Sequence, residues 1–547
     1  MATTIAGWKA AFSLSSTEVK NAVPPGTVTL VERRHEAEDG AGFKDGGRII
    51  KVPTPSSDPA DPLNWPVWRK AAVLLMAAMY PFVADFVSSV IAPAFPVWNS
   101  AFPQEPKPVS DLTHLIAVNV LMLGMSNIWW VPLSNWMGRR PVLLVGTLLM
   151  TLCSMWAGLA TSYNSLLAAR IIQGIGAGPS EAVAPCLVGD VFFVHQRGRA
   201  MAVYTIAICT GPLVGGIAGG YIGTNLGWAY LFWISTALSG FCFIGFALLV
   251  PETLYFRSID AAVSAGLFAD TVKEVNDTHA ENVVSSPAEQ YRPFTFIRSL
   301  SFAQPQSFSC LLHSFLRPWV TCALPGNWVV MLMYGALVGG IVTISVIGAQ
   351  IMAAPPYSWG ANAGLINVGG LIGAGLGAIF TYFVSDAQLE KQAKKESHGH
   401  AEPEARLSML FPSLFLSTGG FFVFGFCAQN PGSGRWVGLQ VGYGMITFGL
   451  MQIPSLGFTY LIDAYKNLAA DCFVATNVSR SVIAFAWTFF VGEWIAKAGA
   501  AEAFGIFGML MGIFSVLTVP LWLFGKRMRI ATAPLVERYN RPEEEKF

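Results

Sequence analysis

Two apolar stretches carry isolated ionisable side chains: Asp85 in MYPFVADFVSSVIAP, and Arg170 and Glu181 in LLAARIIQGIGAGPSEAVAP. A charge in such sequence is costly inside a membrane and generally faces a cavity or a partner. A carboxylate in a low-dielectric environment can take up and release a proton near neutral pH. Asp85 is therefore a candidate for coupling a proton to a substrate, or for attracting a cationic substrate. The alternative is a structural ion pair, for example with Arg170.

Arg170 and Glu181 are 11 residues apart. On a helix they lie on nearly one face, separated by about 16 Å along the axis, so they cannot pair directly. This face either lines a central cavity, or Arg170 fixes helix packing through backbone carbonyls while Glu181 lies near water. Other polar side chains that can reach such a cavity are Gln173, Tyr204 and Tyr334.

A second pattern concerns helix contact and bending. The string GPLVGG holds Gly211, Pro212, Gly215 and Gly216. Glycines let helices approach closely and a proline bends a helix, which suits a gate but also any tightly packed bundle. Arg480 is the matching isolated charge in the second half of the chain, and near a helix end it can instead reach the membrane surface.

The composition indicates what must position these residues. Of 547 residues, 53% are hydrophobic and only 12% charged, and the mean hydropathy is +0.50. So few charges cannot cover a soluble protein, and a polytopic membrane protein is predicted. The net charge of +1 gives no reason to expect a nucleic-acid partner. Neither a metal-binding cysteine spacing nor a nucleotide-binding or metalloprotease motif occurs, so we expect no metal, no cofactor and no enzyme.

Twelve apolar segments have the length of about 20 residues that a helix needs to cross a bilayer. The predicted fold is all-α, with twelve transmembrane helices in two six-helix bundles. The segments lie near 71–95, 112–133, 141–161, 165–189, 200–223, 227–250, 327–353, 361–385, 407–428, 434–462, 473–496 and 501–524.

These segments divide the chain into five parts. We expect a disordered cytosolic tail over 1–70, a bundle over 71–251, a cytosolic linker over 252–325, a second bundle over 326–525 and a cytosolic tail over 526–547. Within the linker, 259–275 is either an amphipathic surface helix or plain linker. With both termini inside, the short inner loops hold nine lysines and arginines and the outer loops three. That distribution follows the positive-inside rule.

The predicted inner loops carry further charges. Gly138, Arg139 and Arg140 form the turn between the second and third segments. The two arginines either engage Asp190 at the inner end of the fourth segment or serve only to keep the loop inside. Arg197 lies in the next inner turn. Asp386 is predicted to join an inner-gate ion network with Glu402, Glu404 and Arg406 of the same loop.

Several strings resemble motifs of the major facilitator superfamily. ARIIQGIGAG is similar to its fourth-helix motif, GPLVGG to the fifth-helix motif of its proton antiporters, and VPLSNWMGRRP to its loop motif. DVFFVHQRG resembles the next inner turn in a fungal branch of the twelve-span drug:proton antiporters. The resemblance implies two bundles around a central site, and a proton-coupling role for Arg170. Asn135 stands where the loop motif has an acid, which puts the family's usual charge relay in doubt.

The predicted function is proton-coupled export of a small organic molecule, a drug or secondary metabolite, by a monomer in the plasma membrane. Its partners are then the substrate, protons and the lipid bilayer. One alternative is proton-driven uptake of a cation or metabolite such as a polyamine, with Asp85 and Glu181 as the cation site. An alternative of another class is a membrane receptor that binds a ligand without moving it.

Overall fold

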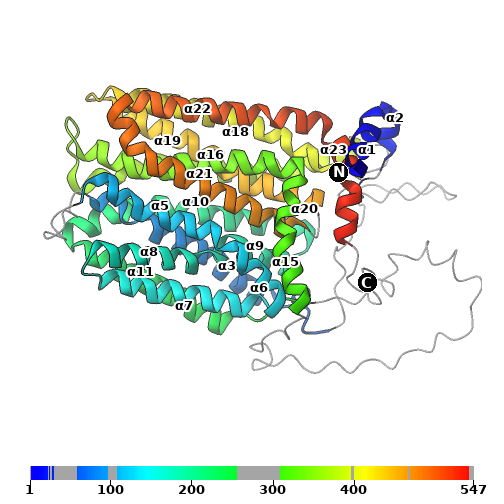
Figure 1. The fold of residues 1–547 in the computed structure, drawn as a ribbon, viewed down its shortest axis with the longest axis horizontal. Helices are drawn as coiled ribbons and strands as arrows, with labels where there is room; N and C mark the ends of the chain where they lie inside the picture. Colours follow the sequence, from blue (N-terminus) through cyan, green and yellow to red (C-terminus); the bar gives the residue numbers. More distant parts are fainter. Residues whose placement is uncertain are drawn as a thin grey trace, which may run out of the picture.

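The computed structural model describes residues 2–22, 24, 28–29, 58–95, 107–255, 308–395, 400–465 and 468–540. These residues are almost entirely helical, as Figure 1 shows. The strands in this part of the chain are two residues long each: β1 (Val28–Thr29) pairs antiparallel with β2 (His400–Ala401).

The first half of the chain supplies six spans, which run alternately up and down. They are α3 (Val67–Ser89) with the short η2 (Ala92–Ala94), α5 (Val109–Met125) with α6 (Asn127–Met137), α7 (Arg139–Gly158), α8 (Tyr163–Ala177) with α9 (Pro179–Val191), α10 (Val194–Asn225) and α11 (Trp228–Leu249).

The second half supplies the other six. They are α16 (Pro325–Ala353), η5 (Gly360–Ile366) with α17 (Asn367–Lys395), α18 (Leu410–Gln429), α19 (Arg435–Gln452) with η7 (Ile453–Gly457) and α20 (Phe458–Tyr465), α21 (Ala469–Ala498), and α22 (Ala500–Val516) with α23 (Thr518–Asn540). Short 3₁₀ helices η1 (Pro62–Asn64), η4 (Thr321–Ala323) and η6 (Pro403–Met409) precede α3, α16 and α18.

The fourth span differs from the prediction of one helix over 165–189. Eleven helical segments of the described chain are long and apolar enough to cross a bilayer, and the twelfth is divided into α8 and α9. Pro179, the first residue of α9, has no N–H to continue the hydrogen bonding of α8, so the helix is interrupted there. With this broken span included, the predicted twelve-helix fold is confirmed.

The outside of the bundle is apolar. Phe415 is 81% exposed, Phe426 63% and Val516 65%. Exposure of so many large apolar side chains to water is unfavourable, whereas their contact with lipid chains is favourable. The protein is an integral membrane protein.

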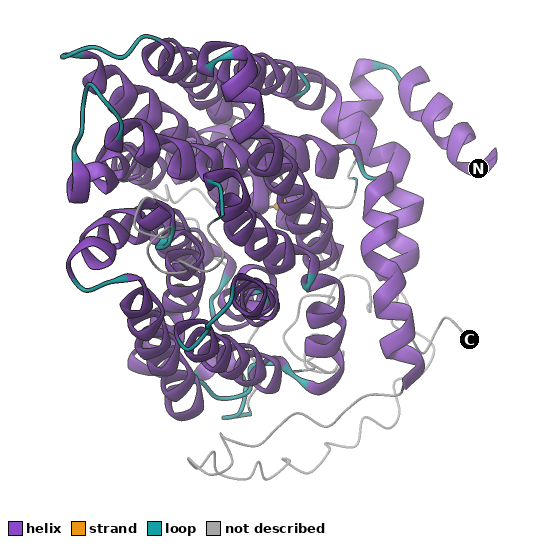
Figure 2. Ribbon diagram, turned by 60° about the vertical axis from the view of Figure 1, so that its left-hand side comes forward, coloured by secondary structure: helices purple, strands orange, loops and turns teal. Residues whose placement is uncertain are grey.

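The two ends of the bundle differ in what covers them. We call the end where α1 (Ala2–Ser13), α2 (Ser16–Asn21) and α15 (Phe308–Val320) lie the termini end, and the opposite one the far end (Figure 1). There α15 crosses the spans at a steep angle, and Arg317 forms an ion pair with Asp471 at 3.3 Å. Figure 2 shows α1 and α2 projecting from the side of the bundle beside the last helix. The predicted surface helix over 259–275 lies outside the described residues.

The halves meet along two seams, α5 against α21 and α10 against α17. Small residues make both seams tight. A Cβ added at Gly124 of α5 would lie 2.5 Å from the carbonyl oxygen of Asn477. A Cβ at Gly364 of η5 would lie 2.4 Å from the carbonyl oxygen of Gly216. Only glycine fits at such distances, so the backbones of the two halves are in direct contact.

Candidate functional site

A cavity lies between the two halves, in the middle of the bundle. Its volume is about 50 Å³, which holds a few water molecules. Both halves line it, and most of its walls are apolar. From the first half come Asp85, Ser88, Ser89, Ala92, Ile116, Val120, Leu123, Ile208, Cys209 and Pro212, and from the second Tyr334, Val338, Ile341, Val342, Ser345, Val346, Leu450 and Arg480. So small a space does not hold a drug-sized molecule, for which pockets of roughly 300–1,000 Å³ are usual.

Asp85 places a carboxylate on the wall of this cavity. The side chain is half-buried because the cavity opens beside it. Among the residues that the structure describes, its carboxylate has neither a hydrogen-bond donor nor an ion-pair partner within bonding distance. The predicted pair with Arg170 does not form, since Arg170 is fully occupied elsewhere.

Arg480 is the cavity's other charged side chain, and it is paired. Its Nη2 forms an ion pair with Oε2 of Glu181 from α9, in the opposite half. Its guanidinium also lies over the ring of Tyr334, 5.1 Å from the centroid. Glu181 is 1% exposed and Arg480 4%. Arg480 therefore does not reach the membrane surface, and Glu181 does not lie near water.

Arg170 is fully buried and caps the end of α3. It donates from Nη1 to the carbonyl oxygen of Val87 at 2.9 Å and from Nη2 to that of Ser88 at 2.9 Å. These are among the last carbonyls of a helix, which have no partner within it. Nε donates to the carbonyl oxygen of Leu115 at 3.2 Å, and Nη1 also donates to Gln173 at 2.6 Å. The packing interpretation of Arg170 therefore describes its contacts.

Three polar aromatic side chains, one of them the candidate Tyr204, support the broken fourth span. Pro179 leaves the carbonyl of Ile175 without its usual partner, and Nε1 of Trp130 donates to it at 2.8 Å. The hydroxyl of Tyr80 donates to the carbonyl of Gly176, and that of Tyr204 donates to the carbonyl of Ser180 at 3.0 Å. Tyr204 thus braces the span and is not among the residues that line the cavity, whereas Tyr334 is.

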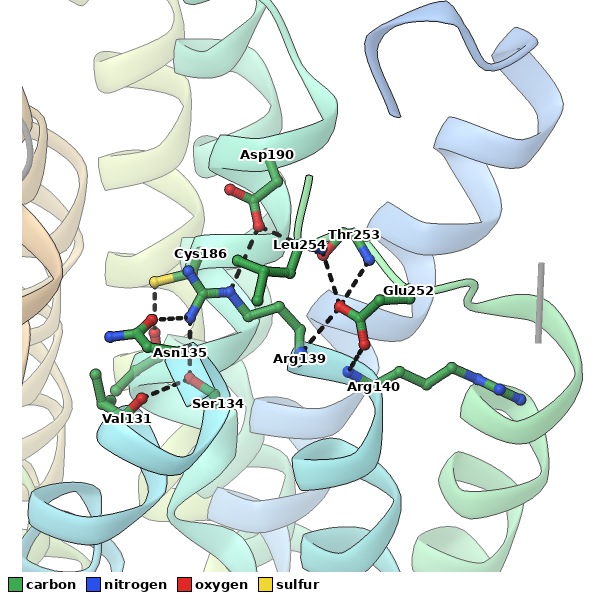
Figure 3. Close-up of polar contacts among 11 residues, drawn as sticks. Val131, Ser134, Asn135, Arg139, Arg140, Cys186, Asp190, Glu252, Thr253 and Leu254 are labelled. Carbon is green, nitrogen blue, oxygen red and sulfur yellow. Dashed lines mark hydrogen bonds and ion pairs between the residues drawn. The ribbon is translucent and has the colours of Figure 1, made fainter. Parts of the chain in front are cut away.

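At the termini end, the turn before α7 is held by an acid that the sequence analysis did not single out (Figure 3). Gly138 has φ 104°, and it offers no side chain to cap α7. Glu252, just after α11, instead accepts hydrogen bonds from the backbone N–H of Arg139 at 2.9 Å and of Arg140 at 3.1 Å. A carboxylate at a helix N-terminus satisfies unpaired donors and opposes the helix dipole.

The side chain of Arg139 points from this turn to the end of α9 (Figure 3). Its Nε lies 3.5 Å from Oδ2 of Asp190, which is one of the two alternatives considered for the arginines of this turn. Its Nη1 donates to Asn135 at 2.6 Å and to Ser134 at 2.9 Å. Asn135 therefore accepts a hydrogen bond where the loop motif has an acid. Arg140 points away and donates to the carbonyl of Ala247 at 2.8 Å.

The residues of GPLVGG lie on two faces of α10. Added Cβ atoms at Gly211 and Gly215 would lie 2.5 Å and 2.7 Å from carbonyl oxygens of α3. A Cβ at Gly216 would instead lie 2.4 Å from the side chain of Asn367 in the other half. Pro212 lines the cavity, and its carbonyl accepts a hydrogen bond from Ser89 at 2.8 Å. One helix thus contacts α3, the cavity and the opposite half.

Two acids of the predicted ion network, Glu402 and Glu404, form ion pairs with positively charged side chains of the last helix. Arg529 of α23 pairs with Glu402 and, at 2.7 Å, with Glu404, while Lys526 pairs with Glu402 at 2.7 Å. Burial opposes the charge of Glu402, but its contacts with Lys526 and Arg529 outweigh burial and hold its pKa below the usual value. The side chains of Arg197, Asp386 and Arg406 lie outside the described part of the structure.

Sequence reasoning missed two residues of these contacts. Glu252 had a usable signal, because it follows an apolar segment that ends on the same side as Arg139. Arg529 lies in the part of the chain that was predicted as a cytosolic tail. Their partners are distant in sequence, so no local pattern predicts the pairing.

Comparison with known proteins agrees with this geometry. The family model of the Major Facilitator Superfamily matches residues 77–487, well over half of the chain. An uncharacterized MFS-type transporter of Schizosaccharomyces pombe is 26% identical, over 93% of this chain and 93% of its own length. The efflux pump radE of Floropilus chiversii is 24% identical, over 92% of this chain and 89% of its own.

The solved structure of the xylose transporter XylE from Escherichia coli, in a partially occluded inward-open conformation, has a similar fold. The TM-score is 0.52 at 15% identity, and the match covers 83% of this chain and 99% of XylE. Because the family model, the fungal relatives and the fold agree, the predictions of a transporter and of no enzyme are confirmed. The chain belongs to the Major Facilitator Superfamily, in its fungal branch, and is an integral membrane transporter of small molecules.

Proposed function

We propose that this transporter exports a small organic molecule from the cytosol in exchange for protons, with Asp85 as the group that binds the proton. The observation that supports this most is the carboxylate of Asp85, which faces the cavity with no bonding partner among the described residues. A carboxylate among apolar walls is stabilised when a proton neutralises it or when a cationic group pairs with it. One site can thus alternate between proton and substrate.

The walls fit a substrate with a large apolar part. Aliphatic side chains from four helices surround Asp85, and polar contacts come from few groups, chiefly Ser88, Ser89 and Tyr334. Pockets of this kind hold a ligand by apolar contact and orient it by a few polar groups. The closed cavity must widen before it admits such a molecule, which alternating access provides.

We further propose that the termini end faces the cytosol of a cell whose plasma membrane holds the protein as a monomer. The excess of loop lysines and arginines at that end supports this orientation. The ion pair Glu181–Arg480 is then part of the inner gate, because it joins the two halves and must break as they separate toward the cytosol. Gly211, Pro212, Gly215 and Gly216 act as the outer gate's hinge.

Flux in sealed vesicles tests the direction. Inside-out plasma-membrane vesicles from cells that make the protein are given an acid lumen, with the membrane potential clamped by potassium and valinomycin. Tetraphenylphosphonium, an apolar cation, serves as the probe together with an extract of cellular metabolites. Export by exchange predicts accumulation of a probe in the acid lumen. Vesicles without the protein are the control, and equal accumulation in both would overturn the proposal.

The second candidate is proton-driven uptake, which the same unpaired carboxylate favours because it attracts cations equally well. Protons and substrate then move together, so an acid lumen drives the probe out of preloaded inside-out vesicles. Spermidine is the probe for this direction. The sign of the flux separates the two mechanisms without any mutation.

A further inference from the structure

The fourth span has a second proline whose effect crosses the seam between the halves. Pro185 lies within α9 and has no N–H. In an α-helix that N–H would bond to the carbonyl four residues earlier, which here belongs to Glu181. The carbonyl of Glu181 is therefore free of its helical partner. A buried carbonyl without a donor is costly, so it requires one from elsewhere.

The donor comes from the opposite half of the protein. Nδ2 of Asn477 in α21 donates to the carbonyl oxygen of Glu181 at 3.1 Å. Asn477 is 1% exposed, so water does not compete for this contact. Arg480, three residues further along α21, lies on the same helix face and pairs with the carboxylate of Glu181. Two residues of α21, one turn apart, thus bind both the backbone carbonyl and the side chain of Glu181.

This double contact lies between the cavity and the termini end. α21 runs from the termini end, so Asn477 is nearer to that end than Arg480, which lines the cavity. α9 runs toward the termini end, and neither Glu181 nor Asn477 is among the cavity-lining residues. Opening of the cavity toward the termini end must therefore break both bonds.

We propose that Asn477 is a positioning residue of the transport cycle, which holds the termini end closed by binding the carbonyl that Pro185 leaves free. This deepens the proposed function, because it adds an uncharged contact to the inner gate. The ion pair with Arg480 depends on the charge of the Glu181 carboxylate. The hydrogen bond from Asn477 goes to the backbone carbonyl of Glu181 and does not depend on that charge. The closed state thus keeps one bond across the seam when ions or protons weaken the other.

Hydrogen–deuterium exchange of the purified full-length protein, with no proton gradient and no substrate, measures opening directly. Asn477→Ala is expected to raise exchange over 179–191 and 469–481 by about two- to tenfold, the effect of one lost hydrogen bond on a two-state equilibrium. Exchange at the far end, over 212–224 and 360–366, is expected to stay the same. Thr476→Ala is the matched control, because Thr476 bonds to Asn327 of its own half at 3.2 Å.

Pro185→Ala supplies the decisive comparison. Alanine at 185 restores an N–H that can bond to the Glu181 carbonyl within α9, so Asn477→Ala in that background should change exchange little. An equal effect of Asn477→Ala in both backgrounds, or no effect in either, would overturn the proposal. Asn477→Leu, which has the same branched shape and no donor, repeats the test should the alanine variant fold poorly. The outcome is independent of whether Asp85 binds protons, because no transport is measured.

Discussion

At the scale of single residues, the buried charges divide into two kinds. Arg170 is fully buried, and its guanidinium donates to three backbone carbonyls. It is not among the residues that line the cavity. Asp85 is half-buried and faces the cavity without a bonded partner in the described chain. The first arrangement stabilises one structure, whereas the second leaves a group available to a ligand.

Arg170→Ala is therefore predicted to destabilise the fold. It leaves three buried acceptors without this donor, the carbonyls of Val87 and Ser88 and the amide oxygen of Gln173, and each such group costs about 1–3 kcal/mol. We expect a clearly lower melting temperature in detergent, with partial recovery in Arg170→Lys, whose ammonium keeps the charge but has fewer N–H donors. The exposed Arg199 of α10 provides the control as Arg199→Ala. A stable Arg170→Ala protein that has lost only the proton dependence of transport would contradict this account.

At the scale of elements, the bundle depends on close backbone contacts that one atom can disturb. A Cβ at Gly215 of α10 would lie 2.7 Å from the carbonyl oxygen of Phe86 and 2.5 Å from Oγ of Ser89. Gly215→Ala must push α10 away from α3, and such overpacking costs about 1–3 kcal/mol. We predict a lower melting temperature and slower transport. At Gly505 in α22 no atom lies within 4 Å of an added Cβ, so Gly505→Ala should be neutral or stabilising.

The contact between η6 and α23 gives a prediction with a defined pH dependence. Because the pKa of Glu402 is lowered in the folded protein, its charge stabilises the fold above the unfolded pKa of about 4.3. That stabilisation is lost as the pH falls through the lowered folded value. Glu402→Gln should therefore reduce the melting temperature equally from about pH 6 to 8, and the difference from wild type should shrink below about pH 4.

The matched control for this prediction is Glu493→Gln. Glu493 pairs with Lys497 at 3.4 Å, but the side chains are 75% and 79% exposed. Exposed pairs contribute little, so no change at any pH is expected. A difference for Glu402→Gln that grows on acidification would mean that the cluster stabilises the protonated form.

The helices also show which features of the fold can be predicted from the sequence and which cannot. Long apolar runs predicted the twelve spans. A helix satisfies its own backbone hydrogen bonds, so a span needs only enough apolar residues to cross the bilayer. The break of the fourth span was missed, although Pro179 is visible in the sequence. The pairing of Glu181 with Arg480 was out of reach, because it depends on how α9 docks against α21. The sequence therefore left two alternatives for Arg480, a gate residue or an arginine that reaches the membrane surface.

At the scale of the whole molecule, two six-helix halves enclose a cavity and touch along two seams. The far-end part of the α10 seam joins backbones directly, and the hydroxyl of Tyr221 donates to Asn362 across it at 2.8 Å. Toward the termini end, Glu181 connects the halves through Arg480 and Asn477. Few polar contacts of the described residues join the halves at either end, which suits a protein that passes between states of similar energy.

The most direct test of the central claim measures coupling in proteoliposomes that hold purified Asp85→Asn protein, beside wild type and Asp85→Glu. Two fluxes of a transported probe are compared: accumulation driven by a pH gradient, and exchange of labelled for unlabelled probe without a gradient. The account predicts that Asp85→Asn loses gradient-driven accumulation by at least about tenfold. The same variant should retain exchange of any probe whose binding needs no negative charge at position 85. Asp85→Glu should retain both fluxes. Gradient-driven accumulation by Asp85→Asn at the wild-type level and with the wild-type pH dependence would contradict it.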